Sequence, residues 1–181
     1  VGVYPELKHP TFLRERGLDP LPAFVSAVQG AGGQAVADRM FVQCFEVGPL
    51  LRLARMSSLR WTCIQLIAAE GAPWDRRDMP YAEMLSEAGL RDMQYERGVT
   101  GIGVEKSLII PRDSENRSLA PTDLVALAHA AGLLVHAWTF RAENYFLPLE
   151  LRRSDDPAAQ GDLAAELRAF YATGLDGVFS D

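Results

Sequence analysis

The chain has 181 residues, 48% of them hydrophobic, and a net charge of −6, which suits a single domain, residues 1–181, with a buried core. The acidic balance argues against nucleic acid or an anionic membrane surface as the main partner, so an anionic ligand would have to meet a local group of cations. No apolar run approaches the roughly 20 residues of a membrane-spanning helix.

Short apolar segments alternate with helical segments along the whole chain. The expected strands are residues 1–8, 41–46, 61–68, 101–106, 133–140 and 177–180. The expected helices are residues 21–40, interrupted by a glycine cluster, and residues 49–56, 85–95, 121–131 and 157–173. A long polar segment, residues 70–81, has the character of a functional lid. Apolar strands that alternate with helices predict a parallel sheet buried on both faces.

Two architectures fit this alternation: an open doubly wound sheet and part of an eight-stranded β/α barrel. The sequence contains no glycine-rich dinucleotide loop, which favours the barrel. Eight β/α units usually need about 250 residues. Six units in 181 residues have about the same number of residues per unit. The sequence therefore predicts an α/β fold, a (β/α)8 TIM barrel from which about two units are missing.

The first expected strand ends in a carboxylate and an ammonium group. Glu6 and Lys8 are two residues apart, so on a strand their side chains point to the same side. In β/α barrels the chemistry lies at the carboxyl ends of the strands. An acid and a base at this position suit a metal ion and a phosphate. Polar residues also end the later strands: Gln43, Glu46, Glu105, Lys106, Thr139, Arg141 and Asp181.

The histidines and cysteines give weaker signals. His136 lies inside an expected strand, two residues before Trp138, and both a position lining the barrel interior and a hydrogen-bonded core position remain open. Cys44 and Cys63 fall inside expected strands and are interpreted as small buried residues, because their spacing matches no zinc or redox motif.

Four stretches together resemble one enzyme family. They are residues 2–10 (Gly-Val-Tyr-Pro-Glu-Leu-Lys-His-Pro), 41–46 (Phe-Val-Gln-Cys-Phe-Glu), 135–144 (Val-His-Ala-Trp-Thr-Phe-Arg-Ala-Glu-Asn) and 174–181 (Gly-Leu-Asp-Gly-Val-Phe-Ser-Asp). In this order they are similar to strands of the glycerophosphodiester phosphodiesterases, in the branch of the bacterial periplasmic-type enzymes and their plant relatives. Cys44 replaces the serine that is usual in the second stretch.

The resemblance implies an eight-stranded barrel whose third to eighth strands are the six expected here, so that this chain corresponds to the carboxyl-terminal part. It implies metal-dependent hydrolysis of glycerophosphodiesters, small-molecule substrates, to glycerol 3-phosphate and an alcohol. The implied cofactor is a divalent cation, Ca²⁺ or Mg²⁺. The implied location is periplasmic or secreted.

The resemblance also assigns roles to five residues. It implies Glu6 as a metal ligand, Lys8 as a catalytic residue near the phosphate, Phe45 and Trp138 as walls around the glycerol or alcohol, and Arg141 as a further phosphate neighbour. The family's first two strands carry a His-Arg pair and a Glu-x-Asp pair, followed by a second histidine. These motifs are absent from residues 1–181, so the histidine acid/base pair and two metal ligands are expected upstream. The Glu6 carboxylate alone supplies far fewer oxygen ligands than the six or so that Ca²⁺ or Mg²⁺ takes.

Two alternatives remain open. One is a related phospholipase D-like metal-dependent enzyme on the same barrel, and the other is a non-catalytic barrel fragment or binding module. An opened barrel leaves unpaired strand edges, which predicts poor solubility or pairing with another copy. The sequence leaves the oligomeric state open.

Overall fold

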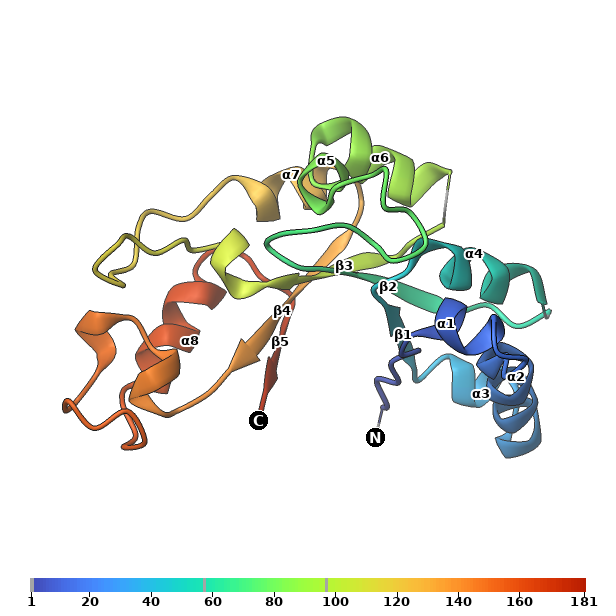
Figure 1. Ribbon diagram of the computed structural model, residues 1–181, viewed down its shortest axis with the longest axis horizontal. Helices are drawn as coiled ribbons and strands as arrows, with labels where there is room; N and C mark the ends of the chain where they lie inside the picture. Colours follow the sequence, from blue (N-terminus) through green and yellow to red (C-terminus); the bar gives the residue numbers. More distant parts are fainter. Residues whose placement is uncertain (1, 57, 97) are drawn as a thin grey trace.

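A five-stranded parallel sheet forms the centre of the structure, a computed structural model that describes residues 2–56, 58–96 and 98–181. The strands follow one another in the order β1-β2-β3-β4-β5. They are Phe41–Cys44 (β1), Thr62–Ile67 (β2), Gly101–Glu105 (β3), Leu134–Phe140 (β4) and Gly177–Ser180 (β5). Figure 1 shows the sheet curved into an arch, with both termini on its open side. A parallel sheet with strands in sequential order is the arrangement of a β/α barrel, so the structure confirms an α/β half-barrel.

Helices cover the outer side of the arch (Figure 1). The α-helices are Pro10–Arg14 (α1), Pro20–Ala31 (α2), Gln34–Ala37 (α3), Val47–Met56 (α4), Tyr81–Met84 (α5), Glu87–Tyr95 (α6), Leu124–Ala130 (α7) and Leu163–Tyr171 (α8). The short 3-10 helices among the described residues are Lys106–Leu108 (η1), Asn144–Phe146 (η2) and Leu149–Leu151 (η3). Within the described ranges, no helix has both the length and the hydropathy needed to cross a bilayer.

The prediction of a continuous strand over residues 1–8 is wrong. The described part of this segment pairs with β1 and the residue before it through two isolated parallel bridges, Val3 with Met40 and Glu6 with Gln43. Pro5 lies between the bridges and has no amide hydrogen to donate, which interrupts a ladder. The segment nevertheless runs beside β1, since Leu7 donates its amide to the Gln43 carbonyl at 2.9 Å. Val1, the first residue of the predicted strand, lies outside the described residues.

Two helices are shorter than predicted. The helix expected over residues 121–131 begins at Leu124, after Asp123. The helix expected over residues 157–173 begins at Leu163, because the Asp162 side chain accepts a hydrogen bond from the Ala165 amide at 2.9 Å and caps it. The predicted helical stretch 21–40 divides into α2 and α3 at Gly32 and Gly33, which have φ angles of 135° and 59°.

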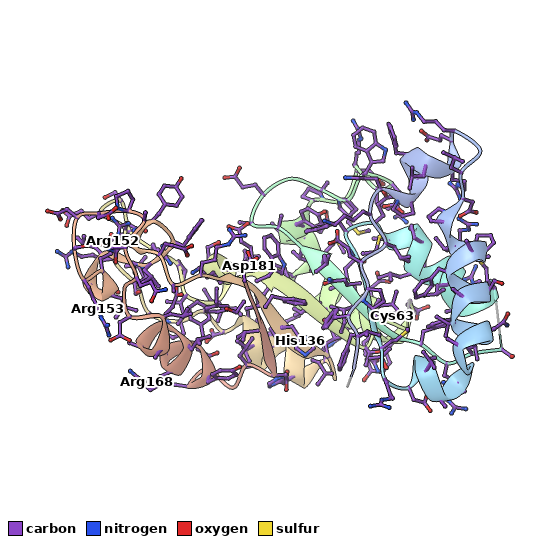
Figure 2. All side chains as sticks on the ribbon, turned by 90° about the horizontal axis from the view of Figure 1, so that it is seen from below. Cys63, His136, Arg152, Arg153, Arg168 and Asp181 are labelled. Atoms are coloured by element: carbon purple, nitrogen blue, oxygen red, sulfur yellow. The ribbon has the colours of Figure 1, made fainter. Side chains whose placement is uncertain are left out.

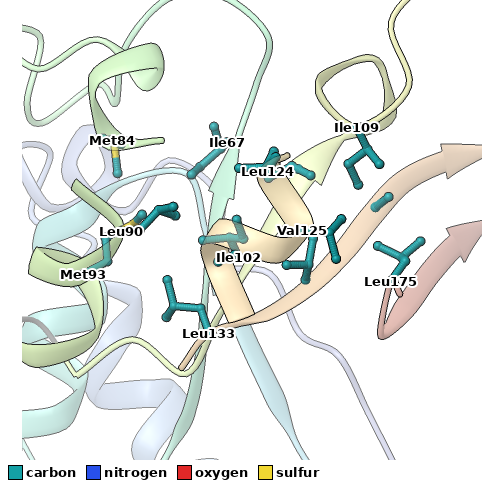
Figure 3. Packing of buried hydrophobic residues seen from close by; sticks show 14 of the residues in the cluster. Ile67, Met84, Leu90, Met93, Ile102, Ile109, Leu124, Val125, Leu133 and Leu175 are labelled. Carbon is teal, nitrogen blue, oxygen red and sulfur yellow. The ribbon is translucent and has the colours of Figure 1, made fainter. Parts of the chain in front are cut away.

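The main core lies between the outer face of the sheet and α5 to α8 (Figure 3). Ile102 on β3 and Leu90 on α6 are completely buried there, and Phe140 on β4 meets Phe170 on α8 edge to face, with ring centroids 4.9 Å apart. A smaller cluster packs β1 against α2 and α4 and includes both cysteines. Both are buried and free, as the sequence predicted. Burial raises the pKa of the Cys44 thiol to about 12, so this side chain packs as a neutral group.

Aromatic side chains join the two ends of the arch on its inner face. Tyr4 stacks on Phe41, with ring centroids 5.1 Å apart, and meets Phe179 of β5 edge to face at 4.7 Å. The Tyr4 hydroxyl and His136 Nδ1 are hydrogen-bonded at 2.7 Å. His136 is therefore a hydrogen-bonded residue, as one of the two sequence interpretations expected. Its partner, Tyr4, belongs to the aromatic side chains on the inner face of the arch, as the other interpretation expected.

This environment predicts that acid destabilises the fold through His136. Burial lowers the pKa of its imidazole below the ordinary value of 6.5. The unfolded chain takes up a proton near that pH and the folded chain does not. The contribution of neutral His136 to the free energy of unfolding is therefore fully present above about pH 6.5, and it is lost as the pH falls through the pKa of His136 in the folded chain. Urea unfolding between about pH 7.5 and pH 5 should show a steeper loss in the wild type than in His136→Gln; equal slopes would contradict this assignment.

Candidate active site

The parallel sheet brings residues from distant parts of the chain to one edge. Carboxyl ends of parallel strands point the same way, so residues at or after these ends become neighbours. Glu6 is bridged to Gln43 near the end of β1, and Phe45 follows β1 directly. Trp138 lies near the end of β4, and Asp181 follows β5. This edge is where the sequence placed the chemistry.

A cavity of about 250 Å³ lies at this edge, and we call it the central cavity. Glu6, Phe45, Trp138 and Asp181 are among the residues that line it. Phe45 and Trp138 meet edge to face with ring centroids 5.8 Å apart. The Trp138 indole Nε1 donates a hydrogen bond to the Gly103 carbonyl at 2.9 Å, which fixes the plane of the ring. The central cavity therefore has two apolar walls and two carboxylates.

A buried glutamine supports the Phe45 wall. Gln65 on β2 is 1% exposed, and its Nε2 donates to the carbonyl oxygens of Cys44 and Phe45, both at 3.1 Å. These contacts hold the backbone at the end of β1 in one position. The aromatic wall is thus part of a rigid edge rather than a free loop.

A second cavity of about 440 Å³ adjoins the central one, and we call it the lid cavity. Glu6 and Phe45 line both cavities, and Trp74, Arg77 and Tyr81 line the lid cavity on the other side. The Arg77 guanidinium lies over the Trp74 ring, 3.8 Å from its centroid. The polar segment 70–81 therefore covers one side of the cavity, in the place that its interpretation as a lid requires. Its movement stays a prediction.

One carboxylate fastens this segment to the sheet edge. Asp75 accepts hydrogen bonds from the backbone amides of Val47, at 3.1 Å, and Gly48, at 2.6 Å. These amides open α4 and have no acceptor within the helix, so Asp75 caps the helix from a distant part of the chain. A negative charge at this helix end is also stabilised by the helix dipole.

Asp75→Ala is expected to lower the free energy of unfolding by about 1 kcal/mol, the usual effect of losing a cap. Amide exchange in residues 70–81 should become faster, because the segment loses its attachment to α4. Asp78→Ala is the matched control, since Asp78 belongs to the same segment and forms an exposed ion pair with Arg76. Hydrogen exchange followed by mass spectrometry tests the pair. Equal exchange rates in both variants would contradict the anchoring role.

Glu6, which lines both cavities, is in contact with Lys8, which is not among the residues that line them. Their charged groups are 3.6 Å apart, and the side chain of Glu6 is 24% exposed whereas that of Lys8 is 71% exposed. Between them, the Leu7 carbonyl accepts a hydrogen bond from Cys44 Sγ at 3.1 Å. Glu6 is therefore held against the cavities, while the ammonium group of Lys8 extends toward solvent.

Arg141 belongs to a neighbouring cavity of about 500 Å³, which we call the cationic cavity. Lys106, Arg112 and Arg141 line it, and it shares Trp138 with the central cavity. Arg141 Nε donates to Asp181 Oδ2 at 2.6 Å. The structure thus brings Glu6, Phe45 and Trp138 into one cavity and connects Arg141 to it through Asp181, whereas Lys8 is outside the lining and reaches the site only through its contact with Glu6.

The comparisons with known proteins decide the family. The model of the Glycerophosphoryl diester phosphodiesterase family matches residues 1–181. The chain belongs to this family. The resemblance found in the four sequence stretches is therefore confirmed at the level of the family.

Individual relatives of the phosphodiesterase family agree. "Glycerophosphodiester phosphodiesterase GDPD6" of Arabidopsis thaliana is 32% identical over 193 aligned residues, which cover the whole chain and 49% of the relative. A solved structure from Silicibacter pomeroyi, named for the same family, has a TM-score of 0.61 and 18% identity over 99% of the chain and 46% of its own length. A glycerophosphodiester phosphodiesterase from Parabacteroides distasonis has a TM-score of 0.54 and 17% identity over 99% of the chain and 53% of its own. The chain spans about half the length of these relatives.

Members of this family generally use divalent cations. Within the described ranges, no group of three or more histidine, cysteine, aspartate or glutamate side chains could hold a metal ion. The carboxylates that line the central cavity are Glu6 and Asp181, and Asp181 is already paired with Arg141. This donor set does not fit Ca²⁺ or Mg²⁺, which take about six or more oxygens.

Sequence reasoning missed several residues of this family member's site. Trp74, Asp75 and Arg77 lie in the segment that was interpreted as a lid, but no pattern indicated which side chains face the cavity. Glu166, whose Oε1 accepts a hydrogen bond from Lys106 of the cationic cavity at 2.7 Å, was also missed, because it lies inside α8, far from any strand end.

Proposed function

We propose that this chain forms part of the active site of a glycerophosphodiester phosphodiesterase, a phosphoric diester hydrolase that releases glycerol 3-phosphate and an alcohol. The observation that carries the proposal is the central cavity, where Glu6, Phe45 and Trp138 meet at the carboxyl edge of the sheet. Family membership supports the same reaction. Residues 1–181 would then be one domain that corresponds to the carboxyl-terminal part of the family's barrel.

The proposed reaction is metal-dependent, with Ca²⁺ or Mg²⁺ as the cation. Glu6 is proposed as one of its ligands. The remaining metal ligands and the histidine acid/base pair are expected from protein sequence outside residues 1–181, because the described residues contain no complete donor set. A cation held by Glu6 together with these further ligands would polarise the phosphate.

The other residues of the site bind and orient the substrate. The Lys8 ammonium is exposed beside Glu6 and would stabilise the charge that develops on a phosphoryl oxygen during hydrolysis. Phe45 and Trp138 would exclude water from the glycerol or alcohol part, because both rings are held in place by their contacts. Arg141 is oriented by Asp181 and would add positive charge beside the phosphate. The substrate is a small molecule.

The test is hydrolysis of glycerophosphocholine by the protein as isolated from its source. Glycerol 3-phosphate should appear, chelation should stop its release, and added Ca²⁺ or Mg²⁺ should restore it. Turnover that is unaffected by a chelator would overturn metal dependence. Turnover of long-chain phospholipids in preference to glycerophosphodiesters would favour the phospholipase D-like alternative.

A non-catalytic module is the second candidate, and the incomplete donor set among the described residues favours it. Absence of turnover in the isolated protein, with every cation supplied, would support this alternative. The family resemblance also supports a periplasmic or secreted location, which fractionation of the source cells tests.

A further inference from the structure

One cation belongs to the lining of the cavities around Glu6. Among the described residues, Arg77 is the one lysine or arginine that lines either the central cavity or the lid cavity. Figure 2 shows Arg153 and Arg168, toward the α8 end of the molecule, apart from Asp181 of the central cavity. Arg77 is therefore the cation best placed to meet an anion inside these two cavities.

The cations that the sequence assigned to the phosphate already have carboxylate partners. Lys8 is 3.6 Å from Glu6, and Arg141 is paired with Asp181. Arg77 differs from both, because its guanidinium forms no ion pair and no hydrogen bond within residues 2–56, 58–96 and 98–181. All of its N–H groups are therefore open to a ligand.

Trp74 and Asp75 hold this guanidinium in place. Arg77 lies over the Trp74 ring, and Asp75, between the two in sequence, fastens the segment to the start of α4. Stacking uses the face of a guanidinium and leaves its N–H edge free, so a stacked arginine can bind two phosphate oxygens at once. A side chain that is already ordered also loses less conformational entropy when it binds an anion.

Two carboxylates line the lid cavity together with Arg77, and both have other partners. Glu6 contacts Lys8 and is proposed as a metal ligand. Glu46 is only 3% exposed, and its Oε2 accepts a hydrogen bond from the Thr11 amide at 3.1 Å. A phosphate between Glu6 and Arg77 would face the proposed cation site on one side and the guanidinium on the other, so positive charge would meet it from both sides.

We propose that Arg77 binds the phosphate of the substrate, as a substrate-binding residue carried by segment 70–81. This inference rests on the proposed function and adds a residue from the lid to a site otherwise built at strand ends. Glu6 lies beside β1 whereas Arg77 belongs to the loop after β2, so a phosphate held by both sides joins the loop to the sheet edge. Substrate binding should therefore order segment 70–81 and exclude water from the cavity.

The first experiment measures this ordering without turnover. Amide exchange in residues 70–81 is followed by mass spectrometry in the protein as isolated from its source, with Mg²⁺ or Ca²⁺ supplied and with glycerol 3-phosphate or glycerol added. Glycerol 3-phosphate should slow the exchange, and glycerol, which has no phosphate, should not. Unchanged exchange with glycerol 3-phosphate, or equal slowing by glycerol, overturns the phosphate contact without any variant.

Two variants assign the effect to one side chain. Arg77→Met removes the guanidinium and keeps a side chain that can pack on Trp74, and glycerol 3-phosphate should no longer slow exchange in this variant. Arg76→Met is the matched control, because Arg76 is paired with Asp78 and is not among the residues that line the lid cavity. It should respond like the wild type. Equal slowing in Arg77→Met and the wild type overturns the inference.

Steady-state kinetics with glycerophosphocholine measure the same contact in the substrate. Arg77→Met should raise KM about 10- to 100-fold, the usual effect of losing a hydrogen bond to a charged group. The value of kcat should change less, because the contact is present both in the bound substrate and in the transition state. Arg76→Met should keep the wild-type KM. A wild-type KM in an active Arg77→Met overturns this inference and leaves the proposed function standing.

Failure of the proposed function has a different signature. Slowing by glycerol 3-phosphate that depends on Arg77, with no glycerophosphodiester hydrolysed by the wild type, would keep Arg77 as an anion-binding residue and overturn the phosphodiesterase.

Discussion

Glu6→Gln is expected to reduce kcat/KM for glycerophosphocholine by at least about 100-fold. Loss of a residue that only supports a metal ligand typically costs 10- to 100-fold in affinity or activity, and a direct ligand should cost more. Glutamine keeps the size of the side chain and removes the charge that would bind the cation. Steady-state kinetics over a series of Ca²⁺ and Mg²⁺ concentrations measure the effect, which should include a weaker response to the added ion.

The control is Glu70→Gln, which makes the same change at an exposed position outside the central cavity. It should leave kcat/KM unchanged. Both variants should unfold at nearly the wild-type urea concentration, since an ion pair with one well-exposed partner, such as Lys8 with Glu6, contributes only about 0–1 kcal/mol. Wild-type activity and metal response in Glu6→Gln would remove Glu6 from the site.

Lys8→Met is expected to lower kcat about 100-fold, within the range found when one group that stabilises developing charge is removed. Methionine keeps most of the length of the side chain and removes the ammonium. KM should change much less than kcat, because the interaction strengthens as charge builds on the phosphoryl oxygens. A rise in KM with unchanged kcat would show that Lys8 binds the substrate without taking part in catalysis.

Lys8→Arg separates charge from geometry. Arginine keeps the positive charge but presents it as a planar group, so this variant should recover part of the activity that Lys8→Met loses. Equal activity of the two variants would mean that the ammonium geometry, rather than the charge, is required.

The sequence predicted the strands of the half-barrel well because they are buried on both faces. Such strands are apolar throughout and stand out from their surroundings, which is why Thr62–Ile67 and Leu134–Phe140 fall within their predicted ranges. The first segment was less predictable, since Pro5 interrupts the pairing that its apolar neighbours favour. Helix ends were missed where a cap lies inside a helical pattern, as at Asp162.

Part of the candidate site could be inferred from topology alone. Once the strands are parallel, Glu6, Phe45 and Trp138 must lie near one edge, and the structure places them around one cavity. Contacts between distant side chains could not be inferred. Asp75 caps a helix that begins 28 residues earlier, and Glu166 pairs with Lys106 across 60 residues; no periodicity in the sequence encodes either contact.

Phosphorus NMR of the products formed from glycerophosphocholine tests the central claim most directly, because it reports which bond is broken. The account predicts that the diester resonance is replaced by that of glycerol 3-phosphate in the protein isolated from its source, and that Glu6→Gln leaves the diester intact under the same conditions. Phosphocholine as the product, no turnover in the wild type with cations supplied, or equal conversion by Glu6→Gln would contradict it.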